Sequence, residues 1–300
     1  MISEVSVRYK LTNSIKDSTR FETDNLAKYH LSFQINFDLF RICVIDSESN
    51  RCLLLEDYSF QNIYSTSDLL EQLEVLFEDH ILIKAGFWKS ITVGIKNTQF
   101  SLVPESLFEK DYLKEYLSLN TTLDKEPGEE YHFFKQKHVE AVNIFATNER
   151  LTAWFNNMYP LKQIRYVHHS APMIEAIMLQ KDTAKNEHSI FVLVEQHFLT
   201  IVVKQGKKLI FCNSFTFNTS EDFVYFILFV FDQLSLNPEQ CPVVVFGEIT
   251  HDSESFSKLY KYIRRLSFGT KPDLVRFGYQ FDELFDHRYF DLYNMHLCQG

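Results

Sequence analysis

Residues 189–215 read SIFVLVEQHFLTIVVKQGKKLIFCNSF. Three runs of β-branched and aromatic residues lie near 189–195, 198–204 and 207–213, and the turn between the last two contains Gly206. Short apolar runs separated by polar turns predict three consecutive β-strands.

A second strand triplet is predicted earlier in the chain. Residues 31–60 read LSFQINFDLFRICVIDSESNRCLLLEDYSF, with strands expected near 31–37, 39–46 and 51–57. Two triplets of the same length and order indicate an internal repeat.

Each triplet is followed by the start of a helix. The first helix is expected at Ser65 and runs through LLEQLEVLF, and the second is expected at Thr219 and runs through FVYFILFVF. Both starts fit a capping box, because a hydroxyl residue is followed three positions later by Asp68 or Asp222. The two hydroxyl residues are roughly 154 positions apart.

The elements after these helices also repeat. An apolar strand is expected at 91–95 (ITVGI) and another at 243–247 (VVVFG). Each is followed by a segment with Tyr and Lys that we expect to be helical, DYLKEYL at 111–117 and KLYKYIRRL at 258–266. The same order at nearly the same offset predicts a duplicated β-β-β-α-β-α unit.

The remaining segments set the expected boundaries of the two halves. The segment 121–130 is polar and predicts a loop, and the polar segment 181–188 predicts a domain boundary. We therefore expect a first half over 1–182, with an insertion around 121–146, and a second half over 188–300. Between and after these points we expect a hairpin at 131–146, a helix from Asn148, a strand in QIRYVHH, a helix in APMIEAIML with Ser170 as its N-cap, and one more strand with short helices after residue 270.

Composition excludes several classes of protein. The chain has 29 Phe and 15 Tyr but only 8 Gly, which disfavours a Gly-rich phosphate loop. A net charge of −10 without a segregated basic run disfavours nucleic-acid binding. The five cysteines form no C-x-x-C pair, so neither a disulfide framework nor a zinc site is expected. The longest apolar run, Phe223–Phe231, is too short for a membrane span, and we expect a cytoplasmic protein with no membrane insertion.

The element order is that of the actin-like ATPase superfamily, which includes actin, heat-shock chaperones and sugar kinases. More closely, the chain resembles an uncharacterised family of Bacteroidetes proteins with an actin-like ATPase fold. The residues that carry this resemblance are the segments 211–234 (FCNSFTFNTSEDFVYFILFVFDQL), 242–249 (PVVVFGEI) and 260–268 (YKYIRRLSF). It implies a duplicated actin-like ATPase (ribonuclease-H-like) α/β fold with two mixed five-stranded sheets. The chain is also distantly similar to PilM-type pilus-assembly proteins, which bind a partner peptide.

The resemblance implies an ATP site with Mg between the halves, formed by two D-x-G loops and an adenosine loop. In the first D-x-G loop, Asn36 stands at the Asp position and Asp38 at the Gly position. In the second, Glu195 replaces Asp and is followed by Gln196 without a glycine.

In the adenosine loop, Gly247 is kept and Glu248 replaces the second glycine. These departures add bulk and negative charge where phosphate would bind, which opposes an anion. We therefore predict a non-catalytic pseudo-ATPase without a cofactor, acting as a scaffold or in protein interaction with an unidentified partner. The alternative is an ATPase-like protein that binds ATP with Mg in the inter-domain cleft.

Three further readings are open. Asp38, Glu195, Glu248 and Asp252 would form a carboxylate cluster in a metal-dependent nuclease, although Asp252 is better placed to open a helix. His168 and His169 suggest a metal, but adjacent strand residues point to opposite faces, so no metal site is predicted. The Phe-rich helix after Asp222 is apolar on nearly every face and is expected to be buried, with a partner groove as the alternative.

Overall fold

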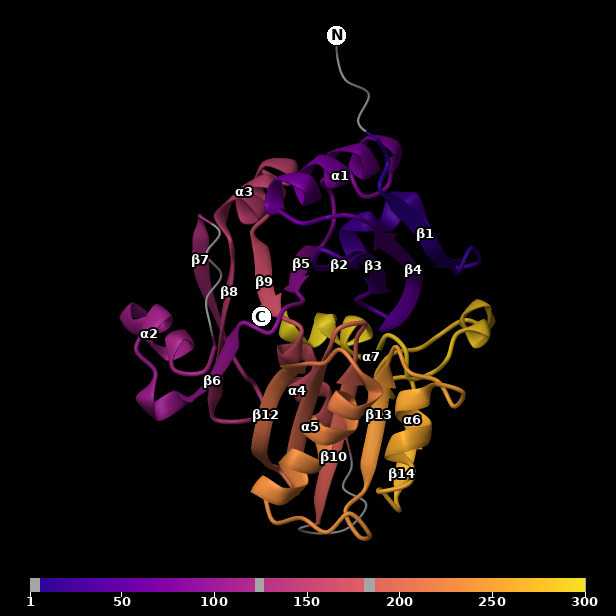
Figure 1. Ribbon diagram of the computed structural model, residues 1–300. Coiled ribbons are helices and arrows are strands. Elements are labelled where there is room, and N and C mark those ends of the chain that lie inside the picture. Colours follow the sequence, from indigo (N-terminus) through magenta and orange to yellow (C-terminus); the bar gives the residue numbers. More distant parts are fainter. Residues whose placement is uncertain (1–5, 122–126, 181–186, 300) are drawn as a thin grey trace.

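The computed structural model describes residues 6–121, 127–180 and 187–299. Two mixed sheets with their helices lie one above the other in Figure 1, and a small third sheet projects to one side. The expected α/β class with two mixed sheets is therefore confirmed.

The first sheet has six strands in the order β1-β4-β3-β2-β5-β9. Strands β1 to β4 pair antiparallel, whereas β2, β5 and β9 run parallel. The central strands β2 and β3 are buried on both faces because helical segments cover both sides of the sheet. The strands are β1 (Tyr9–Lys16), β2 (Tyr29–Ile35), β3 (Leu39–Asp46), β4 (Arg51–Phe60), β5 (Ser90–Ile95) and β9 (Ile164–His168).

Two helices pack on one face of the first sheet. Helix α1 (Thr66–Asp79) is capped by the Ser65 hydroxyl, and helix α3 (Glu149–Met158) by the Asn148 side chain. Both helices place aromatic rings against the sheet, where Phe33 lies 5.9 Å from Phe77 and 5.6 Å from Phe155 between ring centroids.

The second sheet has five strands in the order β12-β11-β10-β13-β14. Helix α5 (Ser220–Gln233) begins with the expected capping box between Thr219 and Asp222, and α6 (Glu254–Leu259) follows β13. The strands are β10 (His188–Val194), β11 (Phe198–Gln205), β12 (Lys208–Thr216), β13 (Val243–Gly247) and β14 (Leu266–Phe268).

Two helical segments connect the sheets by crossing between them. Helix α4 (Ser170–Leu179) follows a strand of the first sheet, but its apolar residues pack on β10 and β11 of the second. Helix α7 (Phe290–Tyr293) and the 3-10 helix η5 (Met295–Cys298) follow the second sheet and pack against β2, β3 and β5 of the first. Each sheet is thus covered by a segment that comes from the other half.

The third sheet, in the order β6-β8-β7, interrupts the first half. It consists of β6 (Phe100–Pro104), β7 (Glu129–Lys135) and β8 (Ala141–Asn148), with the short helix α2 (Leu113–Ser118) against it. The hairpin expected at 131–146 is present as β7 and β8. Part of the loop expected at 121–130 lies outside the described residues, and its last two residues belong to β7.

Several expected elements differ in the structure. The first sheet has a sixth strand, β1, which was not predicted. Most of its residues are exposed, so apolar and polar residues alternate only weakly along it. The segment 111–117 forms a 3-10 turn and helix α2 on the third sheet, so it is not the counterpart of α6; α3 is the second helix on the first sheet. In the segment 258–266 only the first two residues are helical, because α6 ends at Leu259.

Three local predictions were also wrong. In the described residues 271–299 the structure has short helices and a single bridge between Arg51 and Arg276, but no strand. His169, not Ser170, occupies the N-cap of α4, and Ser253, not Asp252, caps α6. No helix in the described part of the chain is long and apolar enough to span a bilayer.

Candidate functional site

The first candidate loop is the turn between β2 and β3. Its Asn36 side chain closes the turn, because Oδ1 accepts hydrogen bonds from the backbone N–H groups of Asp38 at 2.7 Å and Leu39 at 2.8 Å. The Asn36 N–H itself donates to the Leu39 carbonyl at 3.1 Å. The amides of Asp38 and Leu39 are therefore engaged within the turn.

The second candidate loop is the turn between β10 and β11. The Glu195 N–H donates to the Phe198 carbonyl at 2.9 Å, and the Glu195 carboxylate is buried. Gln196 is exposed. The Glu248 N–H donates to the Val194 carbonyl at 2.7 Å, which places Glu248 beside this turn.

Gly247 ends β13 in a left-handed conformation, with φ of +87°. A Cβ at this position would lie 2.1 Å from the Val194 carbonyl oxygen. Only glycine combines this φ with such a close approach of two backbones. The glycine therefore brings β13 against β10 and places Glu248 at the end of the second sheet.

Polar side chains on the neighbouring strands β2, β3 and β4 form a row across the first sheet. Arg41 on β3 is the register partner of Gln34 on β2 and of Asp57 on β4. The Arg41 Nε lies 3.2 Å from Asp57 Oδ1, and its side chain is 1% exposed. A guanidinium this deeply buried needs several anionic partners to remain charged.

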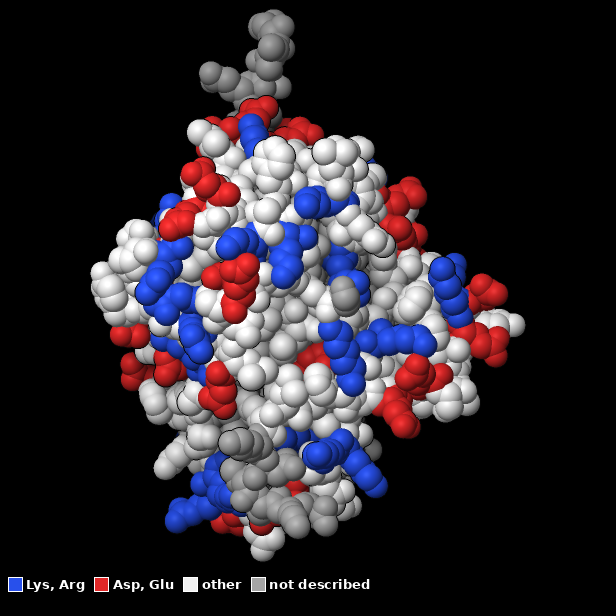
Figure 2. Space-filling view, turned by 180° about the vertical axis from the view of Figure 1, so that it is seen from behind, with Lys and Arg blue, Asp and Glu red and all other residues white. Residues whose placement is uncertain are grey.

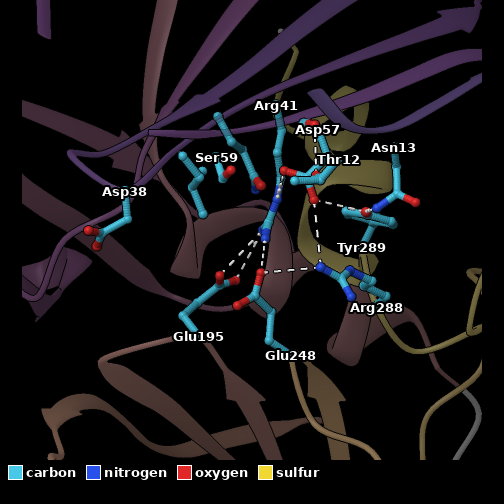
Figure 3. Close-up of polar contacts among 12 residues, drawn as sticks. Thr12, Asn13, Asp38, Arg41, Asp57, Ser59, Glu195, Glu248, Arg288 and Tyr289 are labelled. Atoms are coloured by element: carbon cyan, nitrogen blue, oxygen red, sulfur yellow. Dashed lines mark hydrogen bonds and ion pairs between the residues drawn. The ribbon is translucent and has the colours of Figure 1, made fainter. Parts of the chain in front are cut away.

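Arg41 finds its other partners on the second sheet (Figure 3). Its Nη1 lies 3.3 Å from Glu195 Oε1, and its Nη2 lies 2.7 Å from Glu248 Oε1. Burial lowers the pKa of Arg41, but the carboxylates of Glu195, Asp57 and Glu248 outweigh burial and raise it well above its ordinary value. One side chain of β3 thus joins three carboxylates, which come from β4, from the turn after β10 and from the residue after β13.

Lys96, directly after β5, forms a second link between the sheets. Its Nζ lies 2.5 Å from Glu195 Oε1 and 2.6 Å from Asp291 Oδ2 of α7. The Gln34 amide donates to the same Asp291 oxygen at 2.7 Å. Lys96, Glu195 and Asp291 are all buried, so these contacts form in a medium that screens charges weakly.

Arg288 and Tyr289, directly before helix α7, also belong to this network. Arg288 Nη2 lies 3.8 Å from Asp57 Oδ2 and 3.6 Å from Glu248 Oε1. The Tyr289 hydroxyl donates to Asp57 Oδ2 at 2.8 Å. Burial outweighs the nearby guanidinium of Arg41 and raises the pKa of Glu248.

A cavity of about 220 Å³ remains beside this network. Asn36, Asp38, Glu195, Gln196 and Glu248 all line it, so the structure brings five of the six predicted site residues together. Gly247 acts through the backbone just described. Asp38 points away from the ion pairs in Figure 3.

Sequence reasoning missed the residues that fill the centre: Arg41, Lys96 and Asp291. A signal for Arg41 was present, because it stands in the apolar run LFRICVI, where a charged residue needs a partner. Lys96 likewise follows an apolar strand directly. Asp291 carries no comparable signal, because α7 is too short to show a period.

The other predicted clusters lie apart or have local partners. Asp252 is exposed in the turn before α6. Within the ranges that the structure covers, no group of three or more His, Cys, Asp or Glu residues is arranged to hold a metal ion. His168 and His169 are buried and bind Asn97 O at 2.9 Å and Thr200 Oγ1 at 2.8 Å, respectively.

A family model described as a protein of unknown function (DUF3822) matches residues 17–266. The chain belongs to the DUF3822 family. No curated protein matches the sequence of this DUF3822 member.

Solved structures show the fold that this DUF3822 protein shares. It is similar to a Bacteroides thetaiotaomicron protein with an actin-like ATPase fold and unknown function, with 21% identity, a TM-score of 0.75, and coverage of 83% of this chain and 93% of that one. It is also similar to a chain from the PilM–PilN type IV pilus biogenesis complex, with 10% identity, a TM-score of 0.59, and coverage of 90% and 99%. At these identities the likeness establishes the fold alone.

Proposed function

We propose that this protein is a non-catalytic member of the actin-like ATPase fold that works by binding another protein. The observation that carries the proposal is the position of Arg41. Its guanidinium occupies the centre between the two candidate phosphate loops and binds Glu195 and Glu248 across the sheets. In this proposal a permanent side-chain cation and its carboxylates take the place of Mg-ATP.

The β2–β3 turn and the residues that line the cavity do not fit a nucleoside triphosphate. A phosphate loop offers free backbone N–H groups, but the amides of Asp38 and Leu39 already donate to Asn36 Oδ1. Four acidic residues, Asp38, Asp57, Glu195 and Glu248, line the cavity against one arginine, Arg288, so the lining is acidic and opposes an anion. Its volume of about 220 Å³ is below the roughly 300 Å³ at which small-molecule sites begin.

The fold comparison supports the protein-binding part of the proposal. The chain shares its fold with one chain of the PilM–PilN complex, which is an assembly of two different proteins. The DUF3822 chain keeps that fold while internal ion pairs occupy the centre between its sheets and leave a cavity of only about 220 Å³, so we place its function at its surfaces.

Calorimetric titration with Mg-ATP tests the first part of the proposal. We expect no saturable heat at nucleotide concentrations up to about 1 mM. A dissociation constant above about 1 mM corresponds to a binding free energy of less than about 4 kcal/mol. Micromolar binding that is lost in Asp38→Lys would overturn the proposal.

A nucleotide-binding function is the second candidate, favoured by one observation. Gly247 stands at the first glycine position of the adenosine loop and has a left-handed conformation with a close backbone approach that only glycine allows. The same titration with adenosine alone separates the two functions, because adenosine carries no phosphate to be repelled. Saturable binding of adenosine would support the second candidate, and its absence the first.

A further inference from the structure

A groove of about 820 Å³ runs beside strand β12, well away from the central ion pairs. One wall is the start of β12 and the hairpin before it, residues 207–212. The other wall belongs to the third sheet, from Leu102–Pro104 of β6 and the turn at 138–141. The groove is larger than the central cavity and contains none of its residues.

The backbone of β12 is open on the side of this groove. The strand is the edge of the second sheet and pairs only with β11 within the described part of the chain. The Phe217 N–H donates to His197 O on the β11 side, whereas the Ser214 N–H donates to Asn213 Oδ1. Because N–H groups alternate along a strand, the N–H and C=O of Cys212 point outward. An outward edge of this kind is a template for a further strand.

Both faces beside this edge are apolar. On the side of α5, the rings of Phe211, Phe215 and Phe226 stack in series, with centroids 6.4 Å and 4.8 Å apart. Tyr225 and Phe229 extend this row and are 61% and 38% exposed. Part of α5 therefore lies at the surface, although the whole helix was expected to be buried.

On the opposite face, Leu102 and Val139 of the third sheet pack beside Leu209 and Cys212 of β12. Alternate side chains of an added strand would point to the two faces in turn. A strand that is apolar on both faces fits this edge.

The start of β12 adds a charge preference. Lys207 and Lys208 are exposed at the hairpin and make no ion pair with any residue that the structure describes. Glu140 lines the other wall of the groove and forms no ion pair with either lysine. On the face shown in Figure 2, basic and acidic side chains are mixed, so no single-sign field covers that face. Because Lys207 and Lys208 place two ammonium groups side by side at this point, they favour an acidic residue at one end of the added strand.

We propose that the β12 edge binds an extended segment of a partner protein by strand addition. The segment has five or so residues that are apolar on both faces, with Asp or Glu at the end beside Lys207 and Lys208. The assignment deepens the protein-binding function proposed above and rests on it.

Peptide selection tests the assignment on the full chain. A phage library of random peptides of about twelve residues covers a strand of typical length and its flanks. We expect the selected sequences to share an apolar β-branched or aromatic run with an acidic end. A fluorescent synthetic copy of the strongest sequence is then titrated by anisotropy.

Two variants and one matched control locate the site. Lys207→Glu/Lys208→Glu should weaken peptide binding by about tenfold or more, equivalent to about 1.4 kcal/mol. Cys212→Pro removes the outward N–H without touching the β11 pairing, because edge strands accept proline where the N–H faces out. The control Lys10→Glu/Lys261→Glu changes net charge equally at exposed lysines elsewhere and should leave binding unchanged.

Undiminished binding in Lys207→Glu/Lys208→Glu would overturn the assignment even if Cys212→Pro fails to fold. Selected sequences without the apolar run would overturn it as well. A concentration-dependent dimer that dissociates in the lysine variant would mean that a second copy, not a partner peptide, occupies the edge. None of these results changes the Mg-ATP titration, so failure of this site and failure of the proposed function are distinguishable.

Discussion

The guanidinium of Arg41 and the carboxylate of Glu248 are 207 positions apart in the chain and 2.7 Å apart in the structure. The first belongs to a strand of the first sheet and the second follows a strand of the second sheet. This contact, with those of Glu195 and Asp57, makes the centre of the molecule an ionic junction between its two repeats.

Removing the cation of this junction should destabilise the protein strongly. Arg41→Met keeps an apolar stem but leaves the buried carboxylates of Asp57 and Glu195 without their shared partner. Breaking a buried ion pair from one side costs about 3–5 kcal/mol, and we expect the free energy of unfolding in urea to fall by that amount. Arg264→Met, at an exposed position, is the control and should change it by less than about 0.5 kcal/mol. Equal unfolding midpoints for the two variants would contradict the junction.

The turn between β2 and β3 should depend on one amide. Asn36→Ala removes the acceptor of two backbone N–H groups, so we expect a loss of about 1–2 kcal/mol of unfolding free energy. Gln196→Ala, in the corresponding turn of the second sheet, is exposed and should be close to neutral. Thermal melts of the two variants compare them directly, and a larger loss in Gln196→Ala would refute the role of Asn36.

Two glycines should respond very differently to one added methyl group. Gly247→Ala forces a Cβ to within 2.1 Å of the Val194 carbonyl oxygen at a φ of +87°, and neither backbone is free to move. We expect this variant to unfold or to lose more than about 3 kcal/mol. At Gly86 nothing lies within 4 Å of an added Cβ, so Gly86→Ala should express and melt like the natural protein. Circular dichroism of the purified variants is the measurement, and a folded Gly247→Ala protein of unchanged stability is the contrary outcome.

Acid should weaken the fold before the carboxylates titrate. Burial lowers the pKa of His168 to about 3 and that of His169 well below its ordinary value. The folded pKa lies below the unfolded value of about 6.5, so the stabilisation is complete above pH 6.5 and is lost as the pH falls below it. From pH 6.5 to 5 the loss is about 2 kcal/mol for His168 alone.

Urea unfolding at several pH values between 7 and 5 measures this slope. His169→Gln removes the His169 imidazole and should reduce the slope, because one fewer group takes up a proton on unfolding. A free energy of unfolding that stays constant from pH 7 to 5 would show that folding does not lower the proton affinity of these imidazoles.

The elements predicted correctly are those with strong local signals. The two strand triplets, the caps at Ser65 and Thr219, and the hairpin of the third sheet all depend on short-range patterning, which sequence reveals directly. Strand β1 was missed because its exposed polar residues pair with β4 from one edge. The helix expected over 258–266 ends early because its last residues turn into β14.

The sequence predicted where the candidate site lies but not which side chains fill its centre. The loops at Asn36, Glu195 and Glu248 were located through the resemblance to the actin-like superfamily, and the structure brings them to one cavity. What fills the centre depends on contacts between residues far apart in the chain, such as Lys96 with Asp291. Local patterning contains no information about such pairs.

The crossing of α4 and α7 between the sheets has a consequence for dividing the chain. A fragment that ends near residue 180 would carry α4 without the sheet on which Met173, Ile174 and Ile177 pack. The same fragment would leave the first sheet without α7 and η5, exposing an apolar surface to water. Each half therefore supplies the segment that covers an apolar face of the other. The two halves are expected to become soluble when they are co-expressed and not when either is produced alone.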